Sequence, residues 1–417
     1  MKTARLIFCL LAPGAPMARA TGDFFDNLGS TLTVASANRE TSAKLSGTFD
    51  LEVYRLESPA PGLLYTPDET LLNPRLTLFL DAQAGHRWYF FAQVRVDRGF
   101  DPAKRGLEVR ADEYALRHTP WEDGRLSVQV GKFATVAGNW VLRHGSWANA
   151  FVTAPLAYEE LTGIWDSAAA RTAGILIAWA HAGPASPSPG SVFADKHLRV
   201  PMIWGPAYSS GLALMGETGR LSYAAEIKNG ALSSRPEAWT PDRDSWRHPS
   251  VGARVGFRPN VMWNLGISGS RGVYLRPSAM RLLPAGFGLS DYRQTVLGWD
   301  AGFAWRHWQV WTEVYHARFE VPRVGNADTL ASYVEAKYKF APQFSGAVRL
   351  NRQTFGRIPL ASGQTAAWGR DVWRLDVAPA YRFTAHVQLK LQYSLQEDAG
   401  RAGDPRHFFA GQCTVRF

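Results

Sequence analysis

The 417-residue sequence predicts an all-β fold, a transmembrane antiparallel up-and-down β-barrel of 18 or 16 strands. Three observations predict this fold. Apolar and polar residues alternate with a period of two over most of the chain. The alternating stretches are about 10 residues long, which is the length of a strand that crosses a bilayer, whereas soluble strands are typically about 5–6 residues long. Short and long connections also alternate along the chain, as they do in membrane barrels.

The composition excludes two other classes of protein. The chain is 46% hydrophobic, has a mean hydropathy of −0.19, and contains 22 Phe, 16 Trp and 14 Tyr. This hydrophobic fraction is too high for an intrinsically disordered chain. No run of about 18 apolar residues occurs, which excludes a bundle of transmembrane helices. Alternating strands accommodate many aromatic residues without a long apolar run, because every second position stays polar.

The first 20 residues have the pattern of a secretory signal peptide. Lys2 and Arg5 supply a positive start, residues 6–13 are apolar, and Ala18-Arg19-Ala20 has the form of a cleavage site. We expect residues 1–20 to be removed after export. This cleavage would lower the formal net charge from +10 to +7, because three basic residues leave.

The remaining chain is expected to form one barrel without a disulfide. Residues 21–43 are predicted to be a short N-terminal segment, and residues 44–417 are predicted to be the barrel. Cys9 lies in the predicted signal peptide, so Cys413 would be the single cysteine of the mature chain. A large exported protein without disulfides needs another source of stability, such as a closed hydrogen-bonded sheet.

Sixteen stretches have the period and length of membrane strands. In the clearest one, Val387, Leu389 and Leu391 begin an apolar face, while Gln388, Lys390 and Gln392 begin a polar one. The predicted strands are residues 45–56, 73–84, 86–97, 109–119, 125–134, 211–218, 221–230, 250–258, 261–271, 292–306, 308–320, 330–340, 343–354, 370–383, 386–396 and 407–417.

Residues 135–210 decide the strand number. If both termini lie on the same side of the membrane, the total is even, so this stretch adds either two strands or none. Residues 171–180 alternate like a strand, and a partner could come from residues 161–166 or 196–204. We therefore predict 18 strands, with 16 as the alternative. Either number leaves a lumen too wide for side chains to fill.

Residues 135–170 are predicted to narrow this lumen. Residues 21–43 are too short to form a globular plug, so a loop that folds inward is the remaining means of constriction. The segment is long and rich in aromatic residues, and it could also pack on itself outside the barrel. We expect five of its residues to form the constriction: Arg143, Trp147, Tyr158, Glu159 and Glu160.

If the apolar strand faces meet lipid, the alternate positions face the lumen. Basic residues outnumber acidic ones at these positions, fourteen to seven. Such an excess would raise the local concentration of anions. Opposite charges at similar heights would also orient dipolar solutes, although local ion pairs would leave only a solvated wall. The residues expected to line the pore are Arg254, Arg258, Lys337, Lys339, Arg349, Arg374, Arg382, Lys390, Asp300, Glu313, Glu335 and Asp376.

The last strand carries a family resemblance. Phe409 and Val415 lie on its apolar face, and the chain ends in Phe417. This pattern resembles the C-terminal insertion signal of Gram-negative outer-membrane proteins. The resemblance implies that the strand is read by the barrel-insertion machinery. It also implies an outer-membrane location, with lipid around the barrel and residues 21–43 in the periplasm.

A second resemblance concerns two short motifs. Val130-Gly131-Lys132-Phe133 and Lys228-Asn229-Gly230 look like parts of the phosphate-selective porin family. Members of that family are 16-stranded, usually trimeric channels for anions such as phosphate. The family's ladder of Arg and Lys residues is not placed on this sequence, so its phosphate selectivity does not carry over.

These observations predict a passive outer-membrane porin, a water-filled channel with an anion-leaning lumen for small hydrophilic solutes. A homotrimer is one expected assembly, although the sequence marks no subunit interface. We expect no catalytic residue, metal, cofactor or nucleic-acid partner, because no nucleotide fingerprint or metal-ligand spacing occurs. The alternatives are an adhesive or structural barrel and a barrel hydrolase that would use His144 and Ser146, for which adjacent loop residues seldom have the required geometry.

Overall fold

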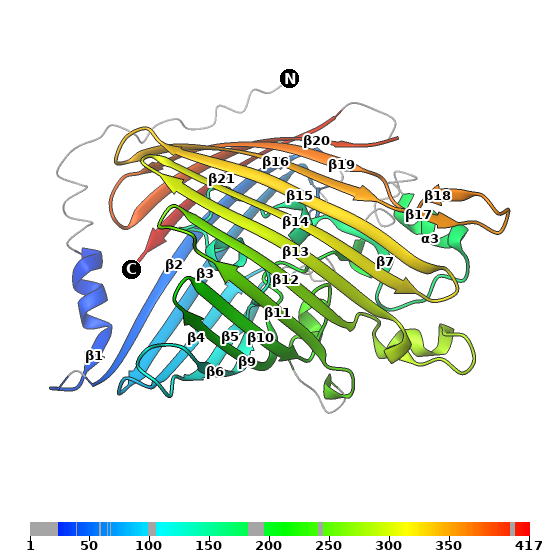
Figure 1. Ribbon diagram of the computed structural model, residues 1–417. Helices are drawn as coiled ribbons and strands as arrows, with labels where there is room; N and C mark the ends of the chain where they lie inside the picture. Colours follow the sequence, from blue (N-terminus) through cyan, green and yellow to red (C-terminus); the bar gives the residue numbers. More distant parts are fainter. Residues whose placement is uncertain are drawn as a thin grey trace, which may run out of the picture.

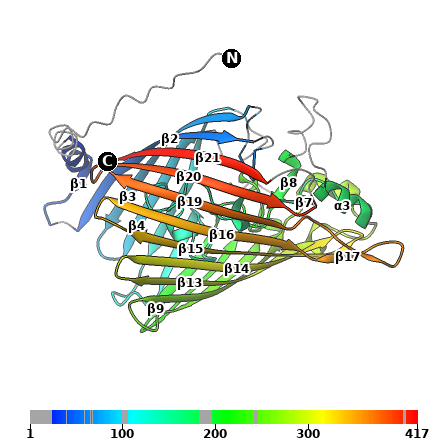
Figure 2. The ribbon, with the colours of Figure 1, turned by 90° about the horizontal axis from the view of Figure 1, so that it is seen from above.

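A computed structural model describes residues 24–38, 40–57, 60–64, 66, 68–98, 106–181, 196–240, 245–400 and 405–417. Within these residues, sixteen antiparallel strands form one closed barrel (Figures 1 and 2). In ring order the strands are β2 (Thr41–Leu56), β3 (Thr70–Ala84), β4 (Trp88–Asp97), β5 (Glu108–His118), β6 (Ser127–Phe133), β9 (Ser209–Thr218), β10 (Leu221–Lys228), β11 (Ser250–Phe257), β12 (Trp263–Val273), β13 (Arg293–Trp305), β14 (Trp308–Val321), β15 (Gly325–Lys339), β16 (Phe344–Phe355), β19 (Val372–Arg382), β20 (Val387–Asp398) and β21 (Arg406–Arg416).

The barrel closes between its first and last strands. β2 pairs with β3 along one edge and with β21 along the other. Gly47 and Phe417 exchange two backbone hydrogen bonds of 3.1 and 3.0 Å at the start of this seam. Closure removes the exposed edges that an open sheet would present. Each predicted strand overlaps one barrel strand, so the prediction of sixteen is confirmed and that of eighteen is wrong.

The described part of residues 135–210 adds no strand to the barrel. Residues 161–165 form β7 (Leu161–Trp165), which pairs with β8 (Arg199–Pro201) in a separate two-stranded sheet. Most of the stretch predicted as a strand, residues 171–180, belongs instead to helix α3 (Ala173–His181), which packs on β7. The rings of Trp165 and Trp179 stack at 4.1 Å across that contact. The helix is apolar nearly all round, so its sequence lacks a clear helical period.

The strands are polar on the inside and apolar on the outside. On β16, Arg349, Asn351 and Gln353 are buried, whereas Val348 and Leu350, which alternate with them, are about half exposed. The same inversion holds on β20, where Lys390, Gln392 and Ser394 are buried and Leu391 is exposed. A soluble sheet shows the opposite distribution, because water favours polar outer faces. An apolar outer surface around a polar interior is the pattern of a membrane-spanning barrel.

The two ends of the barrel differ. At the short-turn end, near the C-terminus in Figure 1, connections are tight, as between Trp305 and Trp308. At the long-loop end, the connections carry η3 (Pro236–Ala238), η4 (Ser245–Arg247), η5 (Pro277–Leu282), η6 (Leu289–Asp291), η2 (Lys196–Leu198) and the hairpin of β17 (Arg357–Pro359) and β18 (Thr365–Ala367). This hairpin extends beyond the rim in Figure 2.

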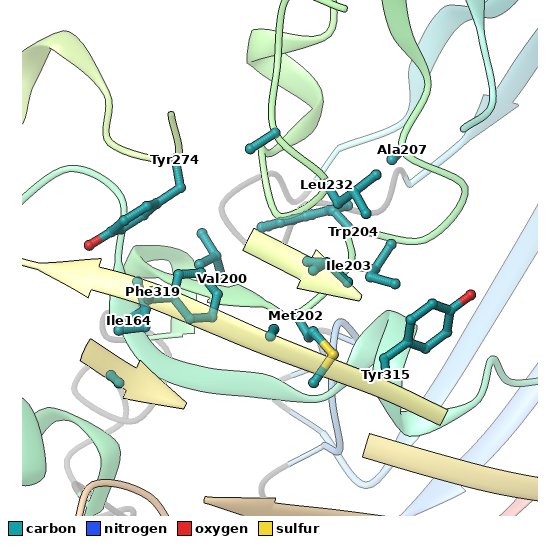
Figure 3. Close-up of a cluster of buried hydrophobic side chains, with 14 of the residues drawn as sticks. Ile164, Val200, Met202, Ile203, Trp204, Ala207, Leu232, Tyr274, Tyr315 and Phe319 are labelled. Atoms are coloured by element: carbon teal, nitrogen blue, oxygen red, sulfur yellow. The ribbon is translucent and has the colours of Figure 1, made fainter. Parts of the chain in front are cut away.

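A hydrophobic core fills part of the long-loop end. Met202, Ile203 and Trp204 follow β8 and are fully buried. They pack with Leu232 and Tyr274 from other long connections, and with Tyr315 and Phe319 on the inner face of β14 (Figure 3). The loops therefore cover this part of the lumen instead of extending into solvent.

The N-terminal segment completes the seam at the short-turn end. Residues 24–31 are helical, and β1 (Thr33–Ala35) pairs with the start of β2. β1 thus occupies the edge of β2 that β21 leaves free. Phe25 stacks on His386 at 5.4 Å, and the Asp26 carboxylate lies 2.9 Å from the same ring. The predicted signal peptide lies outside the described residues, and the boundaries given for it and for residues 21–43 stay predictions.

No helix among the described residues is long and apolar enough to cross a membrane.

The seam gives a direct test of closure and register. Leu51 lies opposite Cys413 across β2 and β21, so a Leu51→Cys variant should form a disulfide with the native cysteine. Directly paired residues have Cα atoms about 4.5–5.5 Å apart, which suits a disulfide. Mild oxidation should change the mobility of the denatured chain in an SDS gel, and a reductant should reverse this change. Val53→Cys is the matched control because Val53 faces Gly411, and cross-linking of Val53→Cys instead would contradict the register.

Candidate functional site

The candidate site is the lumen and the segment that folds into it. Residues 134–160, called the inward segment from here on, follow β6 and contact the inner wall of strands across the ring. The segment contains η1 (Val141–Arg143) and α2 (Leu156–Glu159) and is otherwise irregular. An irregular chain leaves backbone N–H and C=O groups without regular partners, and burial makes each unpaired group costly. Charged and amide side chains of the wall supply those partners.

Wall carboxylates accept hydrogen bonds from the first part of the inward segment. Glu313 on β14 accepts the backbone N–H groups of Asn139 and Trp140 at 2.5 and 2.9 Å. Its other oxygen accepts the Tyr158 hydroxyl at 2.8 Å. Glu226 on β10 accepts the Val136 N–H at 3.2 Å in the same way. These acids are therefore bound to protein donors and do not face open water.

Wall cations and amides bind the second part of the segment. Lys390 Nζ donates to the carbonyl oxygens of Ser146, Asn149 and Phe151 at 2.7, 3.0 and 3.2 Å. Gln392 on the same strand accepts the N–H groups of residues 152 and 153 at 2.7 and 3.2 Å. A single lysine thus satisfies three carbonyls of a non-helical stretch.

A buried ionic network supports these contacts. Arg349 Nη2 donates to the carbonyls of Thr153 and Ala154, both at 3.1 Å. The Arg349 guanidinium also lies 2.9 Å from Asp376, and Arg374 lies 3.1 Å from the same carboxylate. Breaking one partner of a buried ion pair leaves an uncompensated charge, so these residues depend on one another.

Gly138 lets the segment approach the wall closely. Its φ is +77°, a conformation that residues with a Cβ rarely adopt. A Cβ there would collide with the hydroxyls of Tyr315 and Tyr158 and with the Glu313 carboxylate. Glycine at this position therefore permits the turn that brings Asn139 and Trp140 to Glu313.

The predicted pore-lining residues fall into three groups. All lie on the inner face, as the alternation predicts. Seven are buried and paired beneath the inward segment or within the wall, and so do not meet open water: Arg349, Arg374, Lys390, Asp300, Glu313, Glu335 and Asp376. Three are partly buried: Arg254, Lys337 and Arg382. Two are exposed at the short-turn end: Arg258 and Lys339. The period of a strand predicts which face of the sheet a side chain lies on. It does not predict the hydrogen-bond or ion-pair partner that a segment distant in sequence supplies.

The five predicted constriction residues all lie on the inward segment, and most anchor it. Arg143 donates to Glu335 at 2.6 Å and lies 4.3 Å from the ring of Trp311. The Trp147 ring lies between the guanidinium groups of Arg382 and Arg416, at 5.1 and 4.1 Å. Tyr158 is fully buried against Glu313, Glu159 is bound by Arg374, and Glu160 accepts a bond from Gln396.

Two cavities remain beside the inward segment. The first, of about 830 Å³, runs along β2 from Lys44 to Tyr54 and continues over β3 and β4. The second, of about 560 Å³, lies against β5, β6 and β9 to β12 and includes Arg117 and Arg258. Phe91, Glu113, Leu142 and His144 line both cavities. The open part of the lumen therefore lies along strands other than those that carry the main anchors.

Sequence reasoning missed several of these residues. Gln392 and Asn351 bind the segment through amides, and Gly138 acts through its backbone, so none carries a charge signal. Phe91 is an apolar residue at an inward position, and Leu142 lies in the stretch predicted to narrow the lumen but has neither a charge nor a ring that would single it out. The pattern that could have found Phe91 is the inward face of β4, where Tyr89 and Phe91 precede Gln93 and Arg95.

His144 and Ser146 do not form a nucleophile–base pair in this geometry. Nδ1 of His144 lies 2.5 Å from the Val141 carbonyl, and Nε2 lies 2.5 Å from the Tyr208 hydroxyl. The carbonyl requires a proton on Nδ1, so Nε2 accepts from Tyr208. Burial lowers the pKa of His144 to about 4, which keeps the ring neutral near pH 7.

The described residues contain no group of three or more His, Cys, Asp or Glu side chains that could hold a metal ion. In the C-terminal strand, Phe409 is exposed on the outer face, and Val415 is half-buried on the same face beside Phe49 of β2. Phe417 bonds to Gly47 at the seam.

Removing the Lys390 ammonium should loosen the second part of the segment. In a Lys390→Met variant, three carbonyls lose their donor, and each unpaired buried group costs about 1–3 kcal/mol. Hydrogen–deuterium exchange should then accelerate at residues 146–156, by roughly tenfold or more. Lys339→Met removes the same charge from an exposed site and should leave this exchange unchanged. Equal exchange in both variants would contradict an anchoring role for Lys390.

Glu160 predicts a pH-dependent stability. Burial, and then the Asp398 carboxylate, raise the pKa of Glu160 to about 7. The folded state therefore holds this proton more tightly than the unfolded state, and stability falls as pH rises from about 4.5 through about 7. A Glu160→Gln variant removes that loss and should be about 1–2 kcal/mol more stable than wild type at pH 8 but not at pH 4.

Urea unfolding in detergent at the two pH values measures this difference. The exposed Glu217, changed to Gln, is the matched control and should show no difference at either pH. A gain for Glu160→Gln that is larger at pH 4 than at pH 8 would refute the argument.

Comparison with known proteins is informative at the level of structure. No model of a known protein family matches the sequence, and no curated protein sequence matches it. OmpT, an outer membrane protein of Vibrio cholerae, matches with a TM-score of 0.55 and 10% identity over 91% of this chain and 98% of that chain. An anion-selective porin from Comamonas acidovorans matches with a TM-score of 0.54 and 9% identity over 91% and 100%. The outer membrane channel DcaP of Acinetobacter baumannii matches with a TM-score of 0.52 and 10% identity over 92% of this chain and 99% of that chain. The chain thus has the fold of outer-membrane porin barrels.

Proposed function

We propose that the protein is a passive outer-membrane porin that carries small hydrophilic solutes through a water-filled, anion-leaning lumen. The observation that carries this proposal is the closed sixteen-strand barrel with an apolar outer face and two cavities inside it. A barrel of this size encloses more space than its own side chains fill. The inward segment occupies one side of that space and leaves the rest open to solutes.

The expected anion preference rests on the short-turn end. Several buried charges of the wall form ion pairs, as Arg349 and Arg374 do with Asp376, so these pairs contribute little net field to the open lumen. Arg258, Lys339 and Arg416 stay exposed at the short-turn end, and Arg382 is half-buried there. Glu217 lies 3.8 Å from Arg258, and both side chains are exposed, so this ion pair is well solvated. An excess of basic over acidic charge around a mouth raises the local concentration of anions. The fold shared with an anion-selective porin agrees with this proposal but does not carry it.

Location and assembly follow from the same proposal. The signal-like residues 1–20 support export, and the apolar outer face supports an outer-membrane site with the short turns in the periplasm. The outward Phe409 and the terminal Phe417 support recognition by the barrel-insertion machinery. The resemblance to porins supports a homotrimer. Passive diffusion needs no cofactor and no catalytic residue.

The hydrolase alternative is less favoured because His144 is bound to Val141 and Tyr208 instead of Ser146. An adhesive or structural barrel is also less favoured, because several long loops pack inward into a hydrophobic core, although the β17–β18 hairpin extends beyond the rim (Figure 2). Phosphate selectivity is not part of the proposal, since no ladder of free Arg and Lys side chains lines the described wall.

Reconstitution in a planar lipid bilayer tests the channel. The purified protein should give stepwise conductance in KCl, and in a tenfold salt gradient the sign of the reversal potential should indicate preference for chloride. Absence of steps would refute the channel, and preference for potassium would refute the anion lean.

Charge reversal at the mouth tests the origin of the preference. An Arg258→Glu, Lys339→Glu double variant should move the reversal potential toward that of a cation-selective pore, because four units of charge change at exposed sites. Arg352→Glu is the matched control, because Arg352 lies on the outer face. An equal shift in the control would place the selectivity elsewhere.

A further inference from the structure

Three half-buried aromatic side chains of β3 and β4 interrupt the polar pattern of the inner wall beside the first cavity. Phe79 on β3 and Tyr89 and Phe91 on β4 occupy inward positions, and all three line the first cavity. The rings of Tyr89 and Phe91 stack at 6.0 Å, and all three side chains are only half-buried. Inward positions of a porous barrel are expected to be polar. Phe91 packs in part against Phe133 and Ala213, whereas Phe79 and Tyr89 belong to none of the buried apolar clusters in the described part of the chain. Positions that break a local rule without a packing need are candidates for function.

Leu142 on the inward segment presents an apolar side chain to the same space. It is 81% exposed, although its neighbour Val141 is buried and Arg143 is bound to Glu335 and Tyr333. The two neighbours fix the short η1 turn, so Leu142 is held toward the open lumen. Leu142 and Phe91 both line both cavities, so they border the same space.

Arg117 supplies a charge beside these rings. Its guanidinium lies 5.7 Å from the Tyr89 ring, and it lines the second cavity. Nε and Nη2 donate to the neutral amide oxygen of Gln129 at 2.9 and 2.7 Å. No carboxylate within the described ranges forms an ion pair with it. By contrast, Arg75 and Arg254 are each paired with wall carboxylates.

Two carboxylates that border this space, those of Asp81 and Glu113, form no ion pair with Arg117. Asp81 accepts the Tyr89 hydroxyl, and Glu113 accepts the Ala134 N–H at 2.8 Å. Glu113 pairs with Gln93 and Arg117 with Tyr89, so the acid lies four residues along β5 from the guanidinium. His144 is neutral because burial lowers its pKa to about 4.

We propose that Phe79, Tyr89, Phe91, Leu142 and Arg117 form a subsite in the lumen for small organic anions that carry an aromatic ring. This inference rests on the proposed channel function and narrows its class of solute. The aromatic and leucine side chains offer an apolar surface to the ring, and guanidinium is a strong partner for carboxylate. A fully hydrated inorganic anion uses only the charge, and a sugar uses only the rings.

Competition with the chloride current tests the subsite. Benzoate should reduce the single-channel KCl current at lower concentration than acetate, which has the same carboxylate but no ring. Leu142→Asn should raise the half-blocking benzoate concentration about threefold to tenfold, because it removes a contact with the ring. Arg117→Gln should weaken the block by benzoate at least as much. Leu142→Met keeps an apolar side chain and is the matched control.

The outcomes separate the two proposals. KCl steps in every variant show that the barrel has formed and conducts. Absence of steps in the wild type would refute the channel, and the subsite would fall with it. Steps with equal effects of benzoate and acetate would refute the subsite alone. Block by maltose but not by benzoate would also overturn it, since the rings would then serve a sugar.

Discussion

The structure depends on one constraint, which is that an irregular segment inside a barrel must have its backbone polar groups satisfied. The inward segment has little regular secondary structure, so its N–H and C=O groups need side-chain partners from the wall. Glu226 and Glu313 accept N–H groups in its first half, while Lys390 and Arg349 donate to carbonyls in its second half. The wall thus binds the segment much as a protein binds a peptide ligand.

This constraint changes the meaning of the charges in the wall. An excess of basic residues on the inward strand faces predicts an electrostatic field that attracts anions. The side chains do lie on the inward faces. Arg349 and Arg374, however, are fully buried with Asp376, and Lys390 is enclosed by carbonyl oxygens. An ion pair whose two charges are fixed and close produces little field at a distance, and Lys390 is held away from open water by its carbonyl partners. What a solute meets depends instead on exposed residues such as Arg258 and Lys339.

The strands could be predicted from the sequence because the alternation of apolar and polar residues is a local pattern. Alternation in β20 or β16 depends only on neighbouring residues, so each of the sixteen strands could be found without knowing its partner. The error of two strands arose at residues 171–180, where a helix that is apolar nearly all round can be read with either period. The partners of Glu313 and Lys390 could not be predicted, since they lie about 170 and 240 residues away along the chain.

The lumen is consequently divided between two roles. Most inward polar side chains of the strands from β13 to β20 bind the inward segment. A substitution of Glu335 or Arg349 is therefore expected to disturb folding of the segment before it changes which solutes pass. The strands from β2 to β6 keep most of their inward side chains beside open space, although Glu113 on β5 also accepts the Ala134 N–H of the inward segment. Solute preference can therefore be changed on one half of the wall without cost to the anchors on the other. The aromatic residues of β4 lie on the half that is free to vary, and the fixed η1 turn holds Leu142 toward them.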